Sequence, residues 1–217
     1  VEQLRRLAHT VPAVPGVDGD PVVVIDPDAL TGPRYDLQEP DLLADEAVQA
    51  LLVDPSLRRL ADAYLGGEAV NDMAAMWWSV AQPGGPSAAA AQQFHTDRDR
   101  LSFLKFFVYL TDVDDDHGPH VFVRGSHRRL PARLRADRRF TDDEVIGAFG
   151  DDALVRLTGP AGTVFAADTG GLHKGLPPRT GHRLVFQVEY ATSLFGAPFV
   201  QVAPAGLAPD VRALAEA

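Results

Sequence analysis

The segment QFHTDRDRLSFLKFFVYL (residues 93–110) decides the fold prediction, because it joins a short polar motif to a long apolar run. We expect a strand over about 102–112. Its two alternating faces are both apolar, which is typical of a strand buried on both sides. Residues two apart in an extended chain point to the same side, so His95 and Asp97 can face one point. The segment therefore predicts a buried sheet with a polar site beside it.

The sequence on both sides of this segment predicts a mainly β fold with flanking helices, either a sandwich or a jelly roll. Helical periodicity and turn residues place helices over 41–54, 55–66 and 141–149. Short apolar runs between turn signals predict the strands: 21–26, 76–82, 119–125, 153–158, 162–167, 183–191 and 198–203. We expect a single domain over 1–217, with helical or loop cladding over 1–75 and the β core over 76–203.

Composition limits the classes of function. The 217 residues include no cysteine, which excludes disulfides and thiolate metal sites. The formal net charge of −10 argues against nucleic acids and anionic membranes as partners. No apolar stretch is long enough to span a bilayer, and the first residues lack the apolar core of a secretory signal. We therefore expect a cytoplasmic location.

A bare His-x-Asp motif is common by chance, so the prediction of a site depends on further residues. His173 lies between two expected strands, and Arg183 opens the strand that follows it. Two histidines and one carboxylate on one face of Fe(II) leave three open coordination positions, which a bidentate 2-oxo acid and O2 can take. A strand-borne arginine can hold the far carboxylate of such an acid with a pair of parallel hydrogen bonds. The spacing therefore suits both a metal and a cosubstrate.

The sequence resembles the phytanoyl-CoA dioxygenase family of Fe(II)- and 2-oxoglutarate-dependent oxygenases. The resemblance covers about residues 90–191 and rests on FHTD (94–97), FFVYLTDVDDDHGPHVFVRGSHR (106–128), GTVFAADTGGLHKG (162–175) and GHRLVFQVEY (181–190).

This resemblance implies a double-stranded β-helix, a cupin-like jelly roll. It implies Fe(II) ligands at His95, Asp97 and His173, and Arg183 as the partner of the C5 carboxylate of 2-oxoglutarate. The implied reaction uses O2, converts 2-oxoglutarate to succinate and CO2, and oxidises an unactivated C–H bond of a small molecule. Iron halogenases of this broad class lack the carboxylate ligand, so Asp97 favours hydroxylation or a related oxidation.

Two alternatives to this function remain open. A cupin-like metal hydrolase or isomerase would need the same three metal ligands but not Arg183. A catalytically inactive jelly-roll binding protein would be expected to have lost a ligand.

Further residues are expected near the site. Lys105 lies mid-strand, where a buried lysine needs a partner; we expect it to bind the 2-oxoglutarate carboxylate, the alternative being that it reaches an edge of the sheet. The family hallmark at 125–127 has Arg124 where proline is usual. The substrate candidates are Trp78, Arg98, Arg124 and His127. The basic segment 124–139 is either a solvated face or a rim for an anionic substrate.

Overall fold

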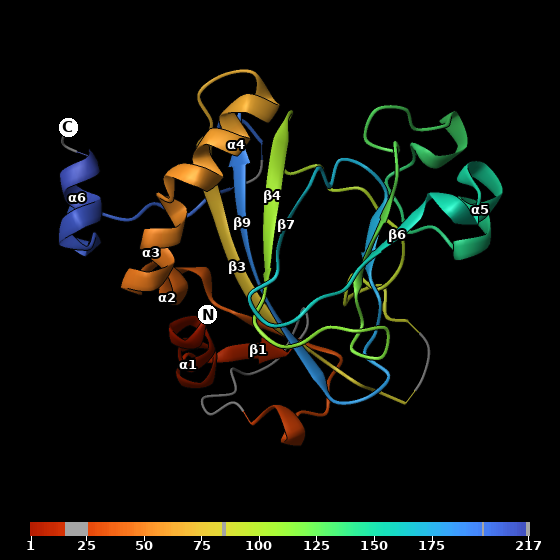
Figure 1. Cartoon of the computed structure of the whole chain (residues 1–217), viewed down its shortest axis with the longest axis horizontal. Helices are drawn as coiled ribbons and strands as arrows, with labels where there is room; N and C mark the ends of the chain where they lie inside the picture. Colours follow the sequence, from red (N-terminus) through yellow and green to blue (C-terminus); the bar gives the residue numbers. More distant parts are fainter. Residues whose placement is uncertain (16–25, 84–85, 197, 216–217) are drawn as a thin grey trace.

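The computed structural model describes residues 1–15, 26–83, 86–196 and 198–215, and these form two antiparallel sheets that face each other (Figure 1). The large sheet has the order β1 (Ala13–Pro15), β2 (Arg34–Leu37), β3 (Val70–Val80), β9 (His182–Ala191), β4 (Phe103–Tyr109) and β7 (Val164–Ala167). The small sheet has the order β6 (Leu154–Leu157), β5 (His120–Val123) and β8 (His173–Gly175). This arrangement confirms the predicted mainly β jelly roll with flanking helices.

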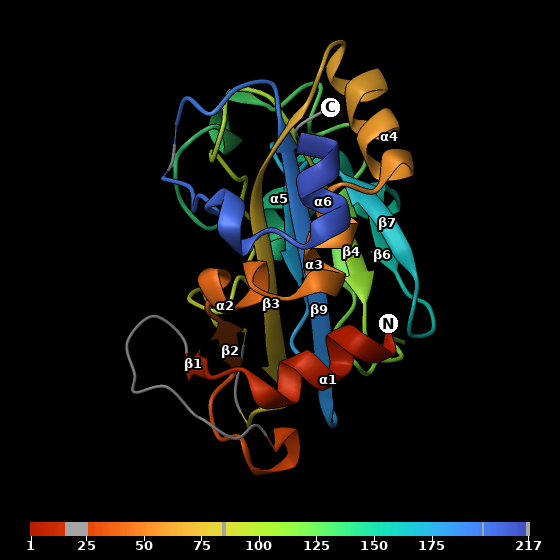
Figure 2. The ribbon, with the colours of Figure 1, turned by 90° about the vertical axis from the view of Figure 1, so that its left-hand side faces the viewer.

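Helices cover the outer sides of both sheets (Figures 1 and 2). The large sheet is covered by α1 (Glu2–Thr10), α2 (Glu39–Leu43), α3 (Glu46–Leu52) and α4 (Pro55–Leu65), and α6 (Pro209–Ala215) lies near the C-terminus. The small sheet is covered by α5 (Asp142–Phe149). Short 3-10 turns are η1 (Pro27–Ala29), η2 (Ala132–Leu134), η3 (Asp151–Ala153) and η4 (Pro204–Gly206). No helix within the described ranges is long and apolar enough to cross a membrane.

Strand β4 is buried on both faces, as its sequence predicts. Leu104, Phe106 and Val108 pack into the core beneath the helices. Phe107 and Tyr109 face the other way, into an apolar cluster between the sheets. The alternation of the strand therefore separates a structural face from a face that borders the space between the sheets.

Local sequence signals explain most helix boundaries. The Asp54 side chain accepts hydrogen bonds from the first turn of α4, and Gly66 ends that helix with φ at 78°. The helix expected over 41–54 is in fact two helices. Asp45 interrupts it because its side chain accepts hydrogen bonds from the amides of Ala47 and Val48, and so begins α3.

Three other expectations need correction or lie outside the described residues. The strand expected over 198–203 is wrong. This segment leaves the sheet and crosses α3, where the Gln49 amide bonds the carbonyl of Gly206 and the amide of Ala208. The first 75 residues are more than cladding, because β1 and β2 extend the large sheet through pairing with β3. Of the expected strand 21–26, residues 21–25 lie outside the described ranges.

A buried ion pair joins β3 to the segment before β4. The Arg100 Nε lies 2.5 Å from the Asp72 Oδ2, and both side chains are at most 1% exposed. Asp72 is at the irregularity of β3, where the pairing register with β9 shifts between Asn71 and Met73. The ion pair therefore stabilises a point at which the ladder is interrupted.

Replacing Arg100 with Met should destabilise the fold by about 3–5 kcal/mol, because it leaves the Asp72 carboxylate buried without its partner. Urea unfolding followed by circular dichroism measures this loss. The control is Arg138→Met, which removes a surface pair with Glu144 and should leave the free energy of unfolding nearly unchanged. Equal stability of Arg100→Met and wild type would contradict this role.

Candidate active site

Two segments distant in sequence place the predicted triad. His95 and His173 form an isolated antiparallel bridge, in which the amide of each donates to the carbonyl of the other at 3.0 Å. The Asp97 amide donates to the carbonyl of Thr169 at 2.8 Å, so the same two segments stay paired beyond the bridge. Directly opposite residues of an antiparallel pair point to one side, which brings both imidazoles together.

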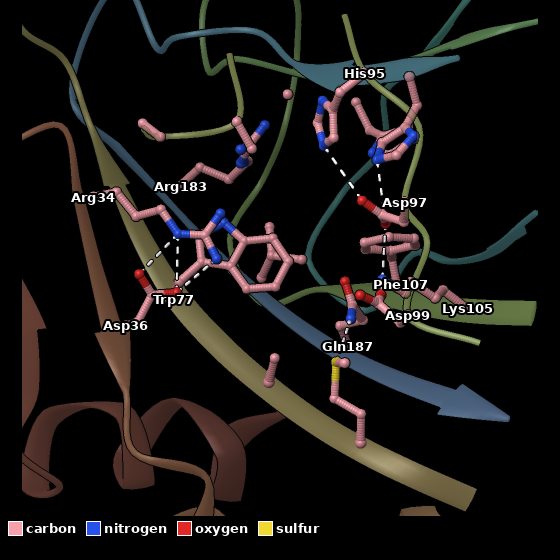
Figure 3. Close-up of a pocket in the computed structure, with 18 of the residues that line it drawn as sticks. Arg34, Asp36, Trp77, His95, Asp97, Asp99, Lys105, Phe107, Arg183 and Gln187 are labelled. Atoms are coloured by element: carbon pink, nitrogen blue, oxygen red, sulfur yellow. Dashed lines mark hydrogen bonds and ion pairs between the residues drawn. The ribbon is translucent and has the colours of Figure 1, made fainter. Parts of the chain in front are cut away.

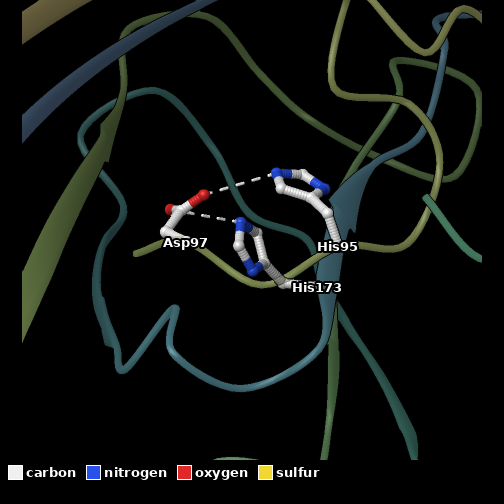
Figure 4. Close-up of side chains that lie close together, drawn as sticks. All are labelled: His95, Asp97 and His173. Carbon is white, nitrogen blue, oxygen red and sulfur yellow. Dashed lines mark ion pairs between the residues drawn. The ribbon is translucent and has the colours of Figure 1, made fainter. Parts of the chain in front are cut away.

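The three side chains converge on one point (Figure 4). His95 Nε2 lies 3.5 Å from Asp97 Oδ1, and His173 Nε2 lies 3.5 Å from Asp97 Oδ2. The Nδ1 atoms face backbone carbonyls, those of Gln93 at 2.9 Å and Gly171 at 3.1 Å. Each Nδ1 therefore carries the proton, and each Nε2 offers its lone pair to the centre.

The electrostatics of the triad suit a divalent cation. Burial lowers the pKa of His95 to about 3 and also lowers the pKa of His173, so both imidazoles are neutral near pH 7. Burial alone would raise the pKa of Asp97, but its electrostatic interactions with His173 and Lys105 outweigh burial and hold that pKa below its usual range. Three potential ligand atoms from these residues lie within 4.8 Å of one another. Two neutral nitrogens and one carboxylate fit Fe(II).

The family hallmark at 125–127 supports the His173 segment from behind. The buried Ser126 hydroxyl donates to the Val123 carbonyl and accepts from the Leu172 amide, both at 2.8 Å. A Cβ at Gly171 would come within 2.8 Å of the His127 backbone nitrogen, so only glycine permits this approach. This segment therefore positions the His173 backbone.

Arg183 is buried, and no carboxylate of the described residues pairs with it. It is 5% exposed, its Nη2 donates to the Ser79 hydroxyl at 3.1 Å, and its Nε has no hydrogen-bond partner among the described residues. Burial lowers its pKa to about 10, which leaves it charged at neutral pH. A Cβ at Gly175 would lie 3.0 Å from the Arg183 Nη2, so β8 passes close to the guanidinium. A buried cation of this kind requires an anion.

Lys105 has three acidic side chains of the protein as partners. Its Nζ lies 2.8 Å from Asp97 Oδ2, 2.7 Å from Asp99 Oδ2 and 3.2 Å from Glu189 Oε2. Burial alone would lower the pKa of Lys105, but these three carboxylates raise it above its usual value. Lys105 engages one oxygen of Asp97, which leaves Oδ1 as the oxygen available to a metal.

One cavity of about 380 Å³ between the sheets contains all five residues of the predicted metal and cosubstrate sites (Figure 3). Its apolar wall consists chiefly of the aromatic side chains Trp77, Phe107, Tyr109 and Phe165. Polar groups of the wall include Arg34, Asp36, Asp99, His120, Arg139 and Gln187. The volume lies within the range of pockets for small molecules.

The four substrate candidates do not line this cavity. Strand alternation directs Trp78 beneath α1, where its Nε1 donates to the Ala8 carbonyl. Its neighbour Trp77 points to the opposite side and lines the cavity. Arg98 is exposed and donates to the Arg135 carbonyl. Arg124 and His127 line a separate cavity of about 400 Å³. The hallmark loop turns them away from the triad while it supports His173.

Several cavity residues could not be predicted from the sequence. His120 is 7% exposed and stacks on His173, with 5.4 Å between the ring centroids and 10° between the planes. Arg34 donates to the Asp36 carboxylate and lies 4.4 Å from the Trp77 ring centroid. Ser79 pairs with Arg183, and Trp77 lies two residues from Ser79 on the same face of β3, which is the cavity face. This register between β3 and β9 cannot be read from the sequence.

Replacing Lys105 with Met should weaken metal binding about tenfold or more, since the second-layer partner of the carboxylate ligand is lost. Titration of the metal-free protein with Co(II), read by visible absorbance, measures this affinity. Lys174→Met is the matched control, because the only other lysine is also buried and pairs with Asp142. If Lys105→Met bound Co(II) normally and only raised the 2-oxo acid requirement, the original expectation for Lys105 would be restored.

Comparison with known proteins gives the family. The model of the phytanoyl-CoA dioxygenase (PhyH) family matches residues 28–184. A comparison with curated proteins finds no match.

Solved structures share the fold at low sequence identity. AviO1 from Streptomyces viridochromogenes Tue57 is 20% identical, with a TM-score of 0.54 over 92% of this chain and 83% of its own. SnoK, a non-heme α-ketoglutarate-dependent carbocyclase from nogalamycin biosynthesis, is 18% identical, with a TM-score of 0.56 over 87% and 73%. HygX from Streptomyces hygroscopicus, solved with nickel and 2-oxoglutarate, is 18% identical, with a TM-score of 0.51 over 93% and 96%.

The family match covers more than half of the chain and includes the His95–Asp97 motif and His173. The chain therefore belongs to the phytanoyl-CoA dioxygenase family, and it is an Fe(II)- and 2-oxoglutarate-dependent oxygenase, as its sequence predicts.

Proposed function

We propose that this enzyme oxidises an unactivated C–H bond of a small organic molecule, most simply by hydroxylation. In this proposal, His95, Asp97 and His173 hold Fe(II), and Arg183 pairs with the far carboxylate of 2-oxoglutarate. The observation that carries it is the buried, carboxylate-free guanidinium of Arg183 in the same cavity as the triad. A metal hydrolase or isomerase needs the three metal ligands but does not require Arg183.

Iron held by these residues would, with 2-oxoglutarate and O2, supply an oxidant strong enough for a C–H bond, with succinate and CO2 as the products of 2-oxoglutarate. The protein contributes position and exclusion of water. The Nδ1 contacts with backbone carbonyls orient both imidazoles, and Lys105 restrains Asp97. Phe107 and Phe165 stack at 5.1 Å and give the cavity an apolar wall.

The fold neighbours support a small-molecule substrate. HygX has been solved with hygromycin B bound, and both SnoK and the epimerase SnoN come from nogalamycin biosynthesis. The cavity volume of about 380 Å³ suits a ligand of modest size beside the cosubstrate. We extend this to a role in tailoring secondary metabolites. The intact triad also disfavours an inactive binding protein.

Asp97→Ala should abolish iron-dependent formation of succinate from 2-oxoglutarate, because the iron site loses its only carboxylate. Liquid chromatography with mass detection measures succinate with and without Fe(II). Succinate formation at the wild-type rate in Asp97→Ala would remove the metal assignment.

Arg183→Met should raise the concentration of 2-oxoglutarate needed for half-saturation by about tenfold or more, the usual effect of losing a charge-assisted bidentate pair. Arg179→Met is the control, because Arg179 lies nearby in sequence but is exposed and pairs with Asp116. Metal binding without any saturable binding of 2-oxoglutarate to the wild type would favour the cupin-like hydrolase or isomerase.

A further inference from the structure

Phe140, which directly follows the basic segment 124–139, pairs with the segment that carries the metal motif. Phe140 forms an isolated antiparallel bridge with Phe94, and its amide donates to the Phe94 carbonyl at 2.8 Å. One step along this register, Arg139 is opposite His95. The two phenylalanines are fully buried in the cluster beneath α5. Alternation directs Arg139 and His95 the other way, and both line the cavity.

Arg139 has no acceptor for its guanidinium in the described structure. Its Nη1 is sealed from solvent and makes no hydrogen bond. Four cationic side chains line the cavity, and they differ in whether a carboxylate of the described residues pairs with them. Arg34 pairs with Asp36, and Lys105 with three carboxylates. Arg139 and Arg183 have no carboxylate partner among the described residues.

The charge of Arg139 acts on the metal ligands. Burial is the main reason for the low pKa values of His95 and His173, and the positive charge of Arg139 lowers both further. Arg183, in contrast, interacts with Tyr109 and Arg34. In the structure, the Arg183 guanidinium donates to Ser79 of β3, whereas the Phe94–Phe140 bridge places Arg139 opposite His95, so the two cations enter the cavity from different elements. One oxyanion, the far carboxylate of 2-oxoglutarate, already has Arg183 as its partner.

We propose that Arg139 binds a second oxyanion, a carboxylate or phosphate on the organic substrate, and thereby holds the substrate beside the triad. This rests on the proposed function and deepens it by naming the chemical class of the substrate. The planar guanidinium matches both oxyanions through two parallel hydrogen bonds. Of the basic segment 124–139, the residue that meets the anion is then Arg139, whereas Arg138 is exposed and pairs with Glu144.

The test uses acetate and methyl phosphate as probes, added at constant ionic strength to the Co(II)-loaded protein saturated with 2-oxoglutarate. Calorimetry measures their affinity, and Co(II) absorbance reports any change at the metal. Arg139→Gln should weaken the preferred probe about tenfold or more. The same substitution should change the affinity for 2-oxoglutarate less than about threefold, which is less than half of the free-energy change expected for the probe. Arg138→Gln removes the adjacent charge and should behave as wild type; Arg139→Lys keeps the charge and should bind at an intermediate level.

Three results would overturn the proposal: unchanged probe binding in Arg139→Gln, equal loss in Arg138→Gln, or a loss of 2-oxoglutarate affinity as large as in Arg183→Met. The last would make Arg139 a cosubstrate residue. The relative affinity for the two probes distinguishes a carboxylate from a phosphate substrate. If the wild type fails to bind 2-oxoglutarate, the proposed function fails separately. The Arg139 variants are then compared in the metal-free Arg183→Met protein, where loss of probe binding still supports the anion site.

Discussion

The pair of backbone hydrogen bonds between His95 and His173 is the constraint on which the site depends. These bonds join His95, in the segment before β4 of the large sheet, to His173 in β8 of the small sheet. They fix which residues of the two segments lie opposite each other. A slip of one residue would turn either imidazole away from the cavity. The Thr169–Asp97 hydrogen bond and the Ser126 hydroxyl restrain the same segments from two further directions. Ligand geometry is thus a consequence of strand pairing.

Charge in the cavity is arranged so that the protein neutralises part of it and leaves the rest for ligands. Lys105 is surrounded by Asp97, Asp99 and Glu189; burial raises the pKa of Glu189 to about 8, so near pH 7 the charge of Lys105 is balanced chiefly by Asp97 and Asp99. Arg34 and Asp36 neutralise each other. Arg139 and Arg183 are the lining cations that the described residues leave without a carboxylate. A metal cation at the triad and anions at these two arginines would neutralise the remaining charges of the cavity.

Short-range patterns in the sequence predicted much of the fold and two members of the candidate metal triad, whereas the third, His173, is implied by the family resemblance. The alternation of β4, the cap at Asp54 and the His-x-Asp spacing depend on neighbouring residues, and the structure agrees with them. Pairings between distant segments could not be predicted. The side of β3 that faces the cavity depends on its register with β9, so the sequence alone does not distinguish Trp77 from Trp78 as the cavity residue. The bridge from Phe94 to Phe140 likewise brings Arg139 into the cavity from a stretch that reads as a solvated face.

The most direct test of the account is an anaerobic titration of the protein with Fe(II) and then 2-oxoglutarate, followed by visible absorbance. The account predicts a weak metal-to-ligand charge-transfer band that saturates as 2-oxoglutarate is added, because the triad leaves adjacent coordination positions for a bidentate 2-oxo acid. Iron binding without such a band would contradict the assignment of Arg183 to the cosubstrate. Failure to bind iron at all would contradict the triad itself.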